Sequence, residues 1–403
     1  MTYLDYQATT PLAPEAFEAM LPWLRDQHAN PHSAHAAGRK ARAMVEHARG
    51  QVAALLPPGG SVAFTSGATE ALNWAIKGTQ GPIVTIATEH AAVLDTVAAE
   101  RARGSVVTIL PVGADGLVDL DVARAAIGPG TGLVAAMLVN NEIGVVQPIA
   151  ALAEIAHGVG ALMLCDAVQG LGRVAIPPGC DLVALSAHKV YGPKGIGALW
   201  IRKGVELAPL LHGGGQEAGG RSGTLSPALC AGFGEAARLL QLREGSDARH
   251  VERLWDVAAD RLGLSPPLPE REGPGVGRYE ERTAAATGRP TPNPSLPGRG
   301  GWVLNGDRSR RYRGNLNIRR DGLDVARLTS ELRDIAFSAG SACASGSGRS
   351  SHALRAVGLS EAQARSSIRL GFGRYTTEAE LTAAIDRIVA AADAQSIAGG
   401  IAA

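Results

Sequence analysis

The chain is poor in aromatic residues, in net charge and in long apolar runs, and each shortage excludes a class of protein. Aromatic residues make up 4% of the 403 residues, and the formal net charge is +1. This near-neutral balance gives no reason to expect nucleic acid or a membrane as a partner. The apolar stretches are much shorter than the ~20 residues of a transmembrane helix. The composition therefore predicts a soluble globular protein with room for two domains.

Cysteine is also scarce. The four cysteines are far apart and form no C-x-x-C pair: Cys165, Cys180, Cys230 and Cys343. Four widely spaced thiols in so long a chain do not make a disulfide framework. The first residues, Met1 to Tyr6, include neither a basic nor an apolar segment, so no secretory signal is predicted. We therefore expect a cytoplasmic protein with reduced thiols.

Between residues 60 and 200, apolar runs alternate with helical patterns. The predicted strands are residues 61–64, 83–88, 105–110, 133–138, 162–165, 182–186 and 198–201. Several of these runs are apolar without alternation, which is typical of a sheet that is buried on both faces. The order of elements predicts an α/β fold with a mostly parallel seven-stranded sheet.

A smaller α/β C-terminal domain is predicted after a long helical stretch, residues 231–261. We place the large domain at residues 11–246 and the small domain at residues 1–10 and 247–403. Residues 265–302 interrupt the small domain with eight prolines, seven glycines and almost no apolar pattern. This composition predicts a largely disordered surface insert.

A lysine and an aspartate each follow a predicted strand. Lys189 lies in the segment Ala184-Leu-Ser-Ala-His-Lys-Val-Tyr-Gly, and Asp166 ends the run Leu162-Met-Leu-Cys-Asp. A pyridoxal phosphate (PLP) site needs this pair, because the lysine forms a Schiff base with the aldehyde and the aspartate keeps the pyridine nitrogen protonated. The pair therefore predicts a PLP enzyme.

The segment Thr65–Asn73 follows a strand and begins a helix. Backbone N–H groups at a helix start favour an anion, and Thr69 adds a hydroxyl, so this turn is a candidate phosphate site. The alternative is an ordinary capped turn between a strand and a helix. Ser186 and His188, beside the lysine, are candidates for the same phosphate.

Three further polar residues follow predicted strands, where open α/β sheets bind ligands. His90 can stack on a pyridine ring or move protons, although a lone histidine there is more often polar surface. Gln169 can donate a hydrogen bond to the phenolic oxygen of PLP. Asn141 can do the same or hold the substrate.

Cys343 and Arg369 are candidates for the chemistry of the substrate. Cys343 is flanked by serines and glycines, which predicts an exposed loop and favours a nucleophile. Arg369 lies in a predicted strand, where it makes either a structural salt bridge or a bidentate clamp on an amino-acid carboxylate.

Four motifs in combination resemble the class I cysteine desulfurases of the class V aminotransferase superfamily. They are Thr65-Ser-Gly-Ala-Thr-Glu, Asn140-Asn-Glu-Ile-Gly-Val-Val-Gln, His188-Lys-Val-Tyr-Gly-Pro-Lys-Gly and Gly340-Ser-Ala-Cys. The resemblance runs from Tyr3 to Glu378, apart from the insert. It implies a fold-type I PLP-dependent homodimer that converts L-cysteine to L-alanine. The sulfur passes to an enzyme cysteine as a persulfide, for iron–sulfur cluster assembly or tRNA thiolation.

The resemblance also implies roles for individual residues. Lys189 carries PLP, and Asp166, Gln169 and His90 contact its ring. The phosphate site is implied to comprise Ala68, Thr69, Ser186 and His188, with Thr224 reaching the cofactor of the other subunit. Asn141 and Arg369 are implied to hold the substrate carboxylate.

The resemblance further implies that Cys343 is the persulfide carrier. It passes sulfur to an acceptor such as an iron–sulfur scaffold protein, and it can transiently ligate a nascent cluster although the resting enzyme holds no metal.

The chain departs from the family pattern at two positions besides the insert. Gln216 replaces the usual histidine, and Ala344 follows the catalytic cysteine where threonine is frequent. An aminotransferase or lyase of the same fold would keep Lys189 and Asp166 without needing Cys343. A non-catalytic protein on this fold is the other alternative. The sulfur acceptor and the use of selenocysteine stay open.

Overall fold

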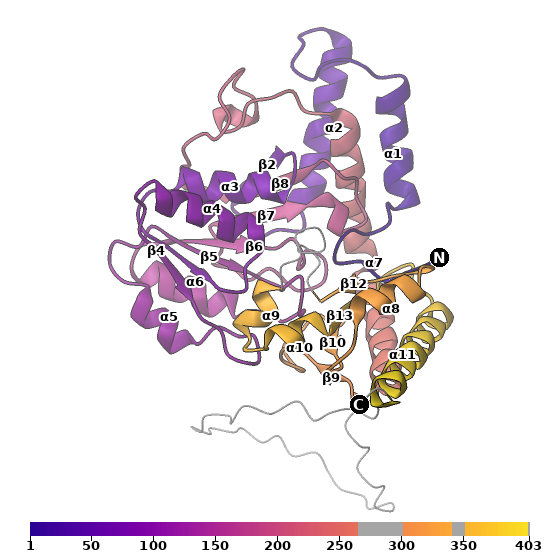
Figure 1. Ribbon diagram of the computed structural model, residues 1–403. Coiled ribbons are helices and arrows are strands. Elements are labelled where there is room, and N and C mark those ends of the chain that lie inside the picture. The colour runs from indigo at the N-terminus through magenta and orange to yellow at the C-terminus, as the bar shows by residue number, and fades with distance from the viewer. Residues whose placement is uncertain (265–300, 341–350, 402–403) are drawn as a thin grey trace, which may run out of the picture.

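The computed structural model describes residues 1–264, 301–340 and 351–401 (Figure 1). Its largest sheet has seven strands in the order β2-β8-β7-β6-β5-β3-β4. Their bounds are Gly60–Thr65 (β2), Ile83–Ile86 (β3), Val107–Leu110 (β4), Leu133–Met137 (β5), Leu162–Asp166 (β6), Leu182–Ser186 (β7) and Gly197–Arg202 (β8). Strand β8 runs antiparallel to both neighbours, and the other neighbouring pairs are parallel. The predicted mostly parallel seven-stranded sheet is confirmed.

Alternate residues of each central strand belong to two different apolar cores, as expected for a sheet covered on both faces. In β7, Leu182 and Ala184 pack with helices α3 and α4, whereas Val183 and Leu185 pack with α6. The helices around this sheet are α1 (Pro14–Arg25), α2 (Ala36–Ala53), α3 (Ala68–Gly78), α4 (Ala91–Ala102), α5 (Leu120–Ala126) and α6 (Ile149–Gly158). The unbroken apolar runs of the sequence follow from this double burial.

A second, four-stranded antiparallel sheet has the order β12-β13-β10-β9. Its strands are Val303–Leu304 (β9), Asn315–Arg319 (β10), Ser338–Ala339 (β12) and Ser367–Gly371 (β13), and a separate parallel pair joins Thr2–Tyr3 (β1) to Ile335–Ala336 (β11). The helices of this region are α8 (Val325–Glu331), α9 (His352–Ala356), α10 (Glu361–Arg365) and α11 (Glu378–Ile401). Leu4 packs in the same core, which joins the N-terminal residues to this sheet.

The expected insert ends earlier than its composition suggested. Residues 265–300 lie outside the described residues, but Trp302 is 1% exposed and packs in the core of the four-stranded sheet. Its large apolar ring is followed directly by β9, so Trp302 belongs to the small core rather than to the insert.

Helix α7, Pro227–Arg261, is 35 residues long and serves both cores. Near its start, Cys230 and Phe233 pack in the core of the large sheet, and near its end Leu254 and Trp255 pack in the core of the small one. The domain boundary predicted at residue 246 falls inside α7. Because the apolar contacts of the helix change from one core to the other along its length, we propose that the two domains share this helix.

Several expected boundaries needed correction. The strand predicted over residues 83–88 ends at Ile86, and the strand predicted over residues 105–110 begins at Val107. Helix α5 has only seven residues, too few to show a clear helical period in the sequence. Its start is marked by Asp119, whose carboxylate accepts hydrogen bonds from the N–H groups of Asp121 and Val122.

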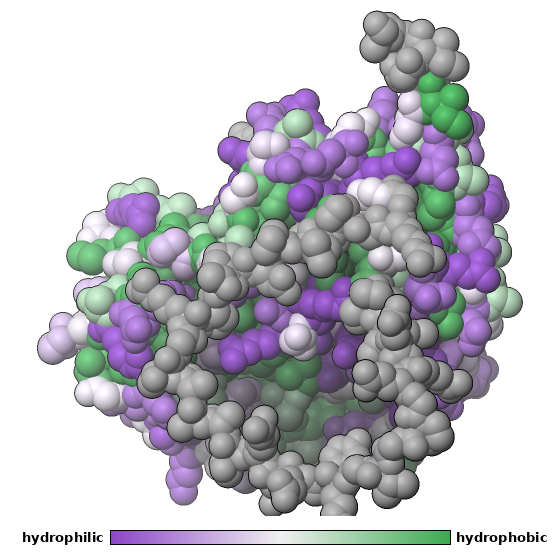
Figure 2. Space-filling model, turned by 90° about the horizontal axis from the view of Figure 1, so that it is seen from below, coloured by the Kyte–Doolittle hydropathy of each residue, from purple (hydrophilic) through white to green (hydrophobic). Residues whose placement is uncertain are grey.

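The surface visible in Figure 2 interleaves hydrophobic and hydrophilic residues where described atoms can be seen. Large exposed apolar side chains include Phe17 and Leu24 in α1 and Leu242 in α7. Among the described helices, none combines the length and hydropathy needed to cross a membrane. Within the described ranges, no group of three or more His, Cys, Asp and Glu side chains is arranged to hold a metal ion.

Candidate active site

A cavity of about 580 Å³ lies at the carboxyl ends of β5, β6 and β7. Parallel sheets usually bind ligands at this edge, because the loops that follow the strands meet there. Nine of the predicted site residues line it together with Arg369: Ala68, Thr69, His90, Asn141, Asp166, Gln169, Ser186, His188 and Lys189. Residues far apart in the sequence are thus brought to one place, as expected.

Lys189 lies on a short 3-10 turn directly after β7. Its Nζ donates hydrogen bonds to the carbonyl oxygens of Gln7 (2.6 Å) and Ala8 (2.8 Å). The N-terminal segment therefore forms one wall of the cavity, a role that its sequence did not signal. The lysine amine is half-buried and held at a defined position.

Asp166 ends β6, the neighbour of β7, and its carboxylate is buried. Burial raises the pKa of Asp166 to about 6, although a hydrogen bond from the N–H of Val168 (2.9 Å) and the charge of Lys189 both act to lower it. A buried carboxylate with a raised pKa is stabilised in its ionised form by any cation or N–H donor placed next to it.

Helix α3 begins at the same cavity. Its N-cap is Gly67, which has no side chain to accept a hydrogen bond from the first turn. Gly197 in β8 explains how the turn lies so close to the sheet: a Cβ there would be 2.6 Å from the carbonyl carbon of Gly67. Ala68 and Thr69 line the cavity from this turn, opposite Ser186 and His188. The arrangement suits an anion, because helix N–H groups carry partial positive charge.

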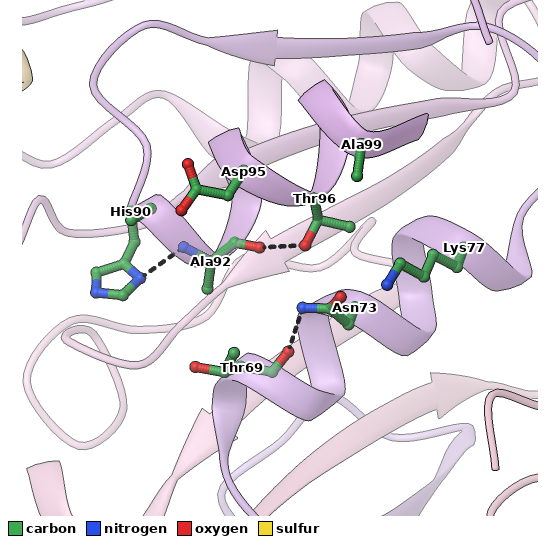
Figure 3. A pocket seen from close by; sticks show the side chains of 9 residues that line it. Thr69, Asn73, Lys77, His90, Ala92, Asp95, Thr96 and Ala99 are labelled. Atoms are coloured by element: carbon green, nitrogen blue, oxygen red, sulfur yellow. Dashed lines mark hydrogen bonds between the residues drawn. The ribbon is translucent and has the colours of Figure 1, made fainter. Parts of the chain in front are cut away.

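His90 is the N-cap of α4, beside the start of α3 (Figure 3). Its Nδ1 accepts a hydrogen bond from the N–H of Ala92 at 3.0 Å. Burial lowers the pKa of His90 to about 4, and the charges of Lys189 and His352 act in the same direction. At neutral pH the ring is therefore neutral, and because Nδ1 is an acceptor its proton lies on Nε2. His90 and Thr69 also border a second, shallower cavity of about 420 Å³ between the two helices.

Arg369, in the middle of β13, is 1% exposed. Its Nη2 donates to Asp5 Oδ1 (2.7 Å) and Ser338 Oγ (3.2 Å), and its Nη1 donates to the carbonyl oxygen of Asn141 (3.0 Å). Its Nε has no hydrogen-bond partner among the described residues. Arg369 makes the structural salt bridge of the first sequence-based alternative. It also lines the cavity, and the clamp on an amino-acid carboxylate stays a prediction.

Arg173 is a site residue that sequence reasoning missed. Its Nη1 donates to Gln169 Oε1 (2.8 Å) and its Nη2 to the carbonyl oxygen of Lys189 (2.6 Å). Because arginine can only donate, the oxygen of the Gln169 amide must face Arg173. The amide nitrogen of Gln169 donates to the carbonyl oxygen of Gln7 (2.9 Å). The amide nitrogen of Gln169, a residue that lines the cavity, carries a second N–H besides the one that Gln7 accepts.

Two buried acids next to the site were also missed. Glu89 Oε1 accepts a hydrogen bond from the N–H of Met137 (2.7 Å), and its pKa is raised well above the usual range by burial and by the neighbouring charge of Asp166. Glu142 accepts a hydrogen bond from Ser351, the N-cap of α9. His352 Nε2 donates to the carbonyl oxygen of Glu89 (2.7 Å). Helix α9 is thereby attached to two loops of the large sheet.

Among the described residues, one predicted site residue, Thr224, is not in the cavity lining. Thr224 is exposed and lies in the loop before α7. Gln216, in the same loop, accepts a hydrogen bond from the N–H of Gly223 at 2.9 Å, so the residue that replaces the family's histidine holds this loop. Cys343 and Ala344 lie outside the described residues, between Gly340 and Ser351.

The comparisons with known proteins agree with this geometry. The family model described as aminotransferase class-V matches residues 2–269. Cysteine desulfurase IscS of Rickettsia bellii is 40% identical over 400 residues, which cover 96% of this chain and 90% of the relative. The chain belongs to the cysteine desulfurases of the aminotransferase class-V family. The resemblance stated from the four sequence motifs is confirmed, and this family depends on PLP.

Solved structures place this cysteine desulfurase chain in the same fold. A NifS-like protein from Rickettsia africae superposes with a TM-score of 0.80 at 27% identity, covering 96% of this chain and 98% of that one. SspA in complex with cysteine gives a TM-score of 0.74 at 33% identity, covering 94% and 100%. The predicted fold-type I architecture is therefore confirmed.

Proposed function

We propose that this chain removes sulfur from L-cysteine, releases L-alanine, and carries the sulfur as a persulfide on Cys343. The observation that carries the proposal is the meeting of Lys189, Asp166, His90 and Arg369 in one cavity of a chain that belongs to the cysteine desulfurases. A lysine, a buried acid, a neutral ring and a buried arginine together are what an amino-acid substrate and PLP require.

The donor set of the cavity fits PLP. Lys189 would hold the cofactor covalently, and the buried carboxylate of Asp166 would face the ring nitrogen, where an N–H partner offsets the cost of burying its charge. The second N–H of the Gln169 amide would donate to the phenolic oxygen. The first turn of α3, with Ser186 and His188, would hold the phosphate. When bound, PLP supplies an electron sink for bonds at the Cα of the amino acid.

Two contacts suggest how His90 and Lys189 divide their work. The pKa of His90, lowered to about 4, and its Nδ1 hydrogen bond to Ala92 favour a neutral ring that stacks and donates from Nε2. We therefore assign the movement of the substrate Cα proton to Lys189 Nζ. In this proposal His90 contributes packing and hydrogen bonding.

Arg369 would bind the carboxylate of L-cysteine, with Asp5 and the carbonyl oxygen of Asn141 fixing the plane of its guanidinium group. Sulfur transfer is balanced without any other oxidant. The Cβ–S bond of the substrate breaks, its electron pair stays on carbon and is protonated to give alanine, and the sulfur forms a new bond with Cys343 Sγ. The reaction needs Cys343 as thiolate, the reactive form of cysteine.

We also propose that the chain works as a homodimer and delivers sulfur to an acceptor protein such as an iron–sulfur scaffold. The exposure of Thr224 is consistent with its contacting the cofactor of a second subunit. Cys165, Cys180 and Cys230 are free thiols, which supports the proposed cytoplasmic location because thiols stay reduced there.

Mass spectrometry of the protein after incubation with L-cysteine tests the proposal. We expect the peptide that contains Cys343 to gain the mass of one sulfur atom. In Cys343→Ser, both this mass gain and the L-cysteine-dependent release of sulfide should be lost. Cys230→Ser, a buried cysteine remote from the cavity, is the matched control and should keep both signals.

If Cys343→Ser forms alanine at the normal rate, the persulfide mechanism is wrong and a lyase or aminotransferase reaction replaces it. If the wild-type protein binds PLP but forms neither alanine nor persulfide, the desulfurase assignment itself is wrong.

A further inference from the structure

An ion pair beside the phosphate end of the cavity has no role in the chemistry described above. Arg221 Nε donates to Glu70 Oε1 at 2.7 Å, and Arg221 Nη2 donates to Glu70 Oε2 at 3.1 Å. Each side chain is only 13% exposed. The pair joins α3 to the loop before α7, which are separated by about 150 residues of sequence.

Glu70 occupies a sensitive position. It lies three residues after the N-cap Gly67, and its Oε2 also accepts a hydrogen bond from the N–H of Ser66 at 2.8 Å. Ser66 and Thr69, on either side of the turn, both line the cavity. A carboxylate at a helix start is attracted by the same partial positive charge that attracts a phosphate. Glu70 therefore lies where it can compete with and repel a bound anion.

Glu70 remains ionised in this setting. Burial acts to raise its pKa, but the hydrogen bonds from Arg221 and Ser66 outweigh burial and lower it. The carboxylate thus keeps a full negative charge at neutral pH. Arg221 supplies the compensating positive charge, through two parallel hydrogen bonds that fix its orientation.

The loop holds Arg221 in place independently of Glu70. Leu211 forms a parallel bridge with Arg221, and Ser222 N–H donates to the carbonyl oxygen of Leu211 at 3.1 Å. Glu217 in the same loop accepts hydrogen bonds from Arg49 at 2.6 and 2.8 Å. Arg221 is therefore presented to α3 by an anchored loop.

We propose that Arg221 is a positioning residue for the phosphate site: it neutralises Glu70, so that the first turn of α3 can hold a dianionic phosphate. The inference rests on the proposed function, because it takes the phosphate of PLP as the anion. It also joins phosphate binding to the loop that bears Thr224, three residues after Arg221.

The test measures binding to the cofactor-free protein. Inorganic phosphate, PLP and pyridoxal, which has no phosphate group, are titrated calorimetrically into wild type, Arg221→Ala, Glu70→Gln and the double variant. Arg320→Ala is the control, because Arg320, itself 16% exposed, pairs with the more exposed Asp393 (2.5 Å) in the region of the four-stranded sheet.

We expect Arg221→Ala to bind phosphate and PLP about tenfold more weakly. The reason is that the uncompensated carboxylate of Glu70 then repels the anion, at the effective dielectric of a protein surface. Pyridoxal binding should stay unchanged. Glu70→Gln keeps an acceptor for the Ser66 N–H, so the double variant should recover wild-type affinity. Arg320→Ala should match wild type with all three ligands.

Failure of the double variant to recover would overturn the proposal, because it would mean that Arg221 contacts the anion directly or only supports the loop. An equal loss for pyridoxal would overturn it as well. If Arg221→Ala does not fold, Glu70→Gln alone decides: its phosphate affinity should be unchanged or higher, and a loss contradicts the proposal. Wild-type protein that binds neither phosphate nor PLP would instead contradict the proposed function.

Discussion

The two sheets border the same cavity but build their sides of it differently. The seven-stranded sheet contributes loops that follow parallel strands, so that Asp166 and Lys189 come from adjacent strand ends. The four-stranded sheet contributes Arg369 from the middle of a strand, buried and already paired with Asp5. On the side of the large sheet, the order of the parallel strands brings the site residues together. On the side of the small sheet, the site depends on the long side chain of Arg369 and its ion pair with Asp5.

The electrostatics differ in the same way. On the side of the large sheet, burial shifts the pKa of Asp166 up to about 6 and that of His90 down to about 4, so both charged forms are disfavoured. On the side of the small sheet, Arg369 already has an ion-pair partner, the carboxylate of Asp5 at 2.7 Å. A ligand that brings its own charges is therefore expected to stabilise the first side more than the second.

The largest effect is expected from removing the lysine of the large-sheet side. Lys189→Ala should lower the rate of alanine formation by at least about a thousandfold, because the proton-moving amine and the covalent attachment of PLP are both lost. The visible absorbance band of the bound cofactor should shift or disappear. Lys203→Ala, an exposed lysine after β8, is the control and should retain both. Normal turnover in Lys189→Ala would remove this residue from the mechanism.

The small-sheet side is tested by Arg369→Ala. We expect KM for L-cysteine to rise about 100-fold while the affinity for PLP is unchanged, since charge-assisted hydrogen bonds to the substrate carboxylate are lost. Asp5→Asn keeps the arginine but loosens its orientation, so a rise of about tenfold is expected. Steady-state kinetics beside a cofactor titration separates the two sides. A loss of PLP binding in Arg369→Ala would show that the sides are not independent.

A stability measurement against pH isolates Asp166. Its pKa is raised from 3.8 to about 6 in the folded protein, so the cofactor-free folded state binds more protons than the unfolded state between these values. The free energy of unfolding of the cofactor-free protein should therefore fall as pH rises from about 4 to 6, by roughly 3 kcal/mol from this group. Urea unfolding of wild type and Asp166→Asn should show this difference only above pH 4. Parallel curves for the two proteins would contradict the raised pKa.

The smallest effect is expected from Arg173→Met, which leaves the cavity lining intact. PLP affinity should fall about fivefold, because Gln169 loses the partner that orients its amide by a charge-assisted hydrogen bond. An analogue of PLP without the 3-hydroxyl group should bind wild type and variant more nearly equally. Combined with Gln169→Ala, the arginine substitution should add little. A full additional loss in the double variant would mean that Arg173 acts through the Lys189 carbonyl instead.

The comparison of the two sides also shows how far the sequence could be read. Lys189, Asp166 and His90 were found because each follows an apolar run, and parallel strand ends meet at one edge. Asp5 could not be found in this way, since its contact with Arg369 joins residues 364 positions apart. The sequence indicated the role of Arg173 only weakly, through its position four residues after Gln169. Trp302 was misassigned because the Pro- and Gly-rich composition before it hid the strand that follows.

Helix α7 has a consequence for dissecting the molecule. At 1.5 Å per residue its 35 residues span about 52 Å, and each half presents a different apolar stripe. A cut at residue 246 would leave Phe233 on one fragment and Trp255 on the other, each on a shortened helix. Each fragment would keep only part of the helix that packs in its core, so the two regions cannot be exchanged as independent modules. Engineering that exchanges one of them between relatives must carry the whole of α7 with it.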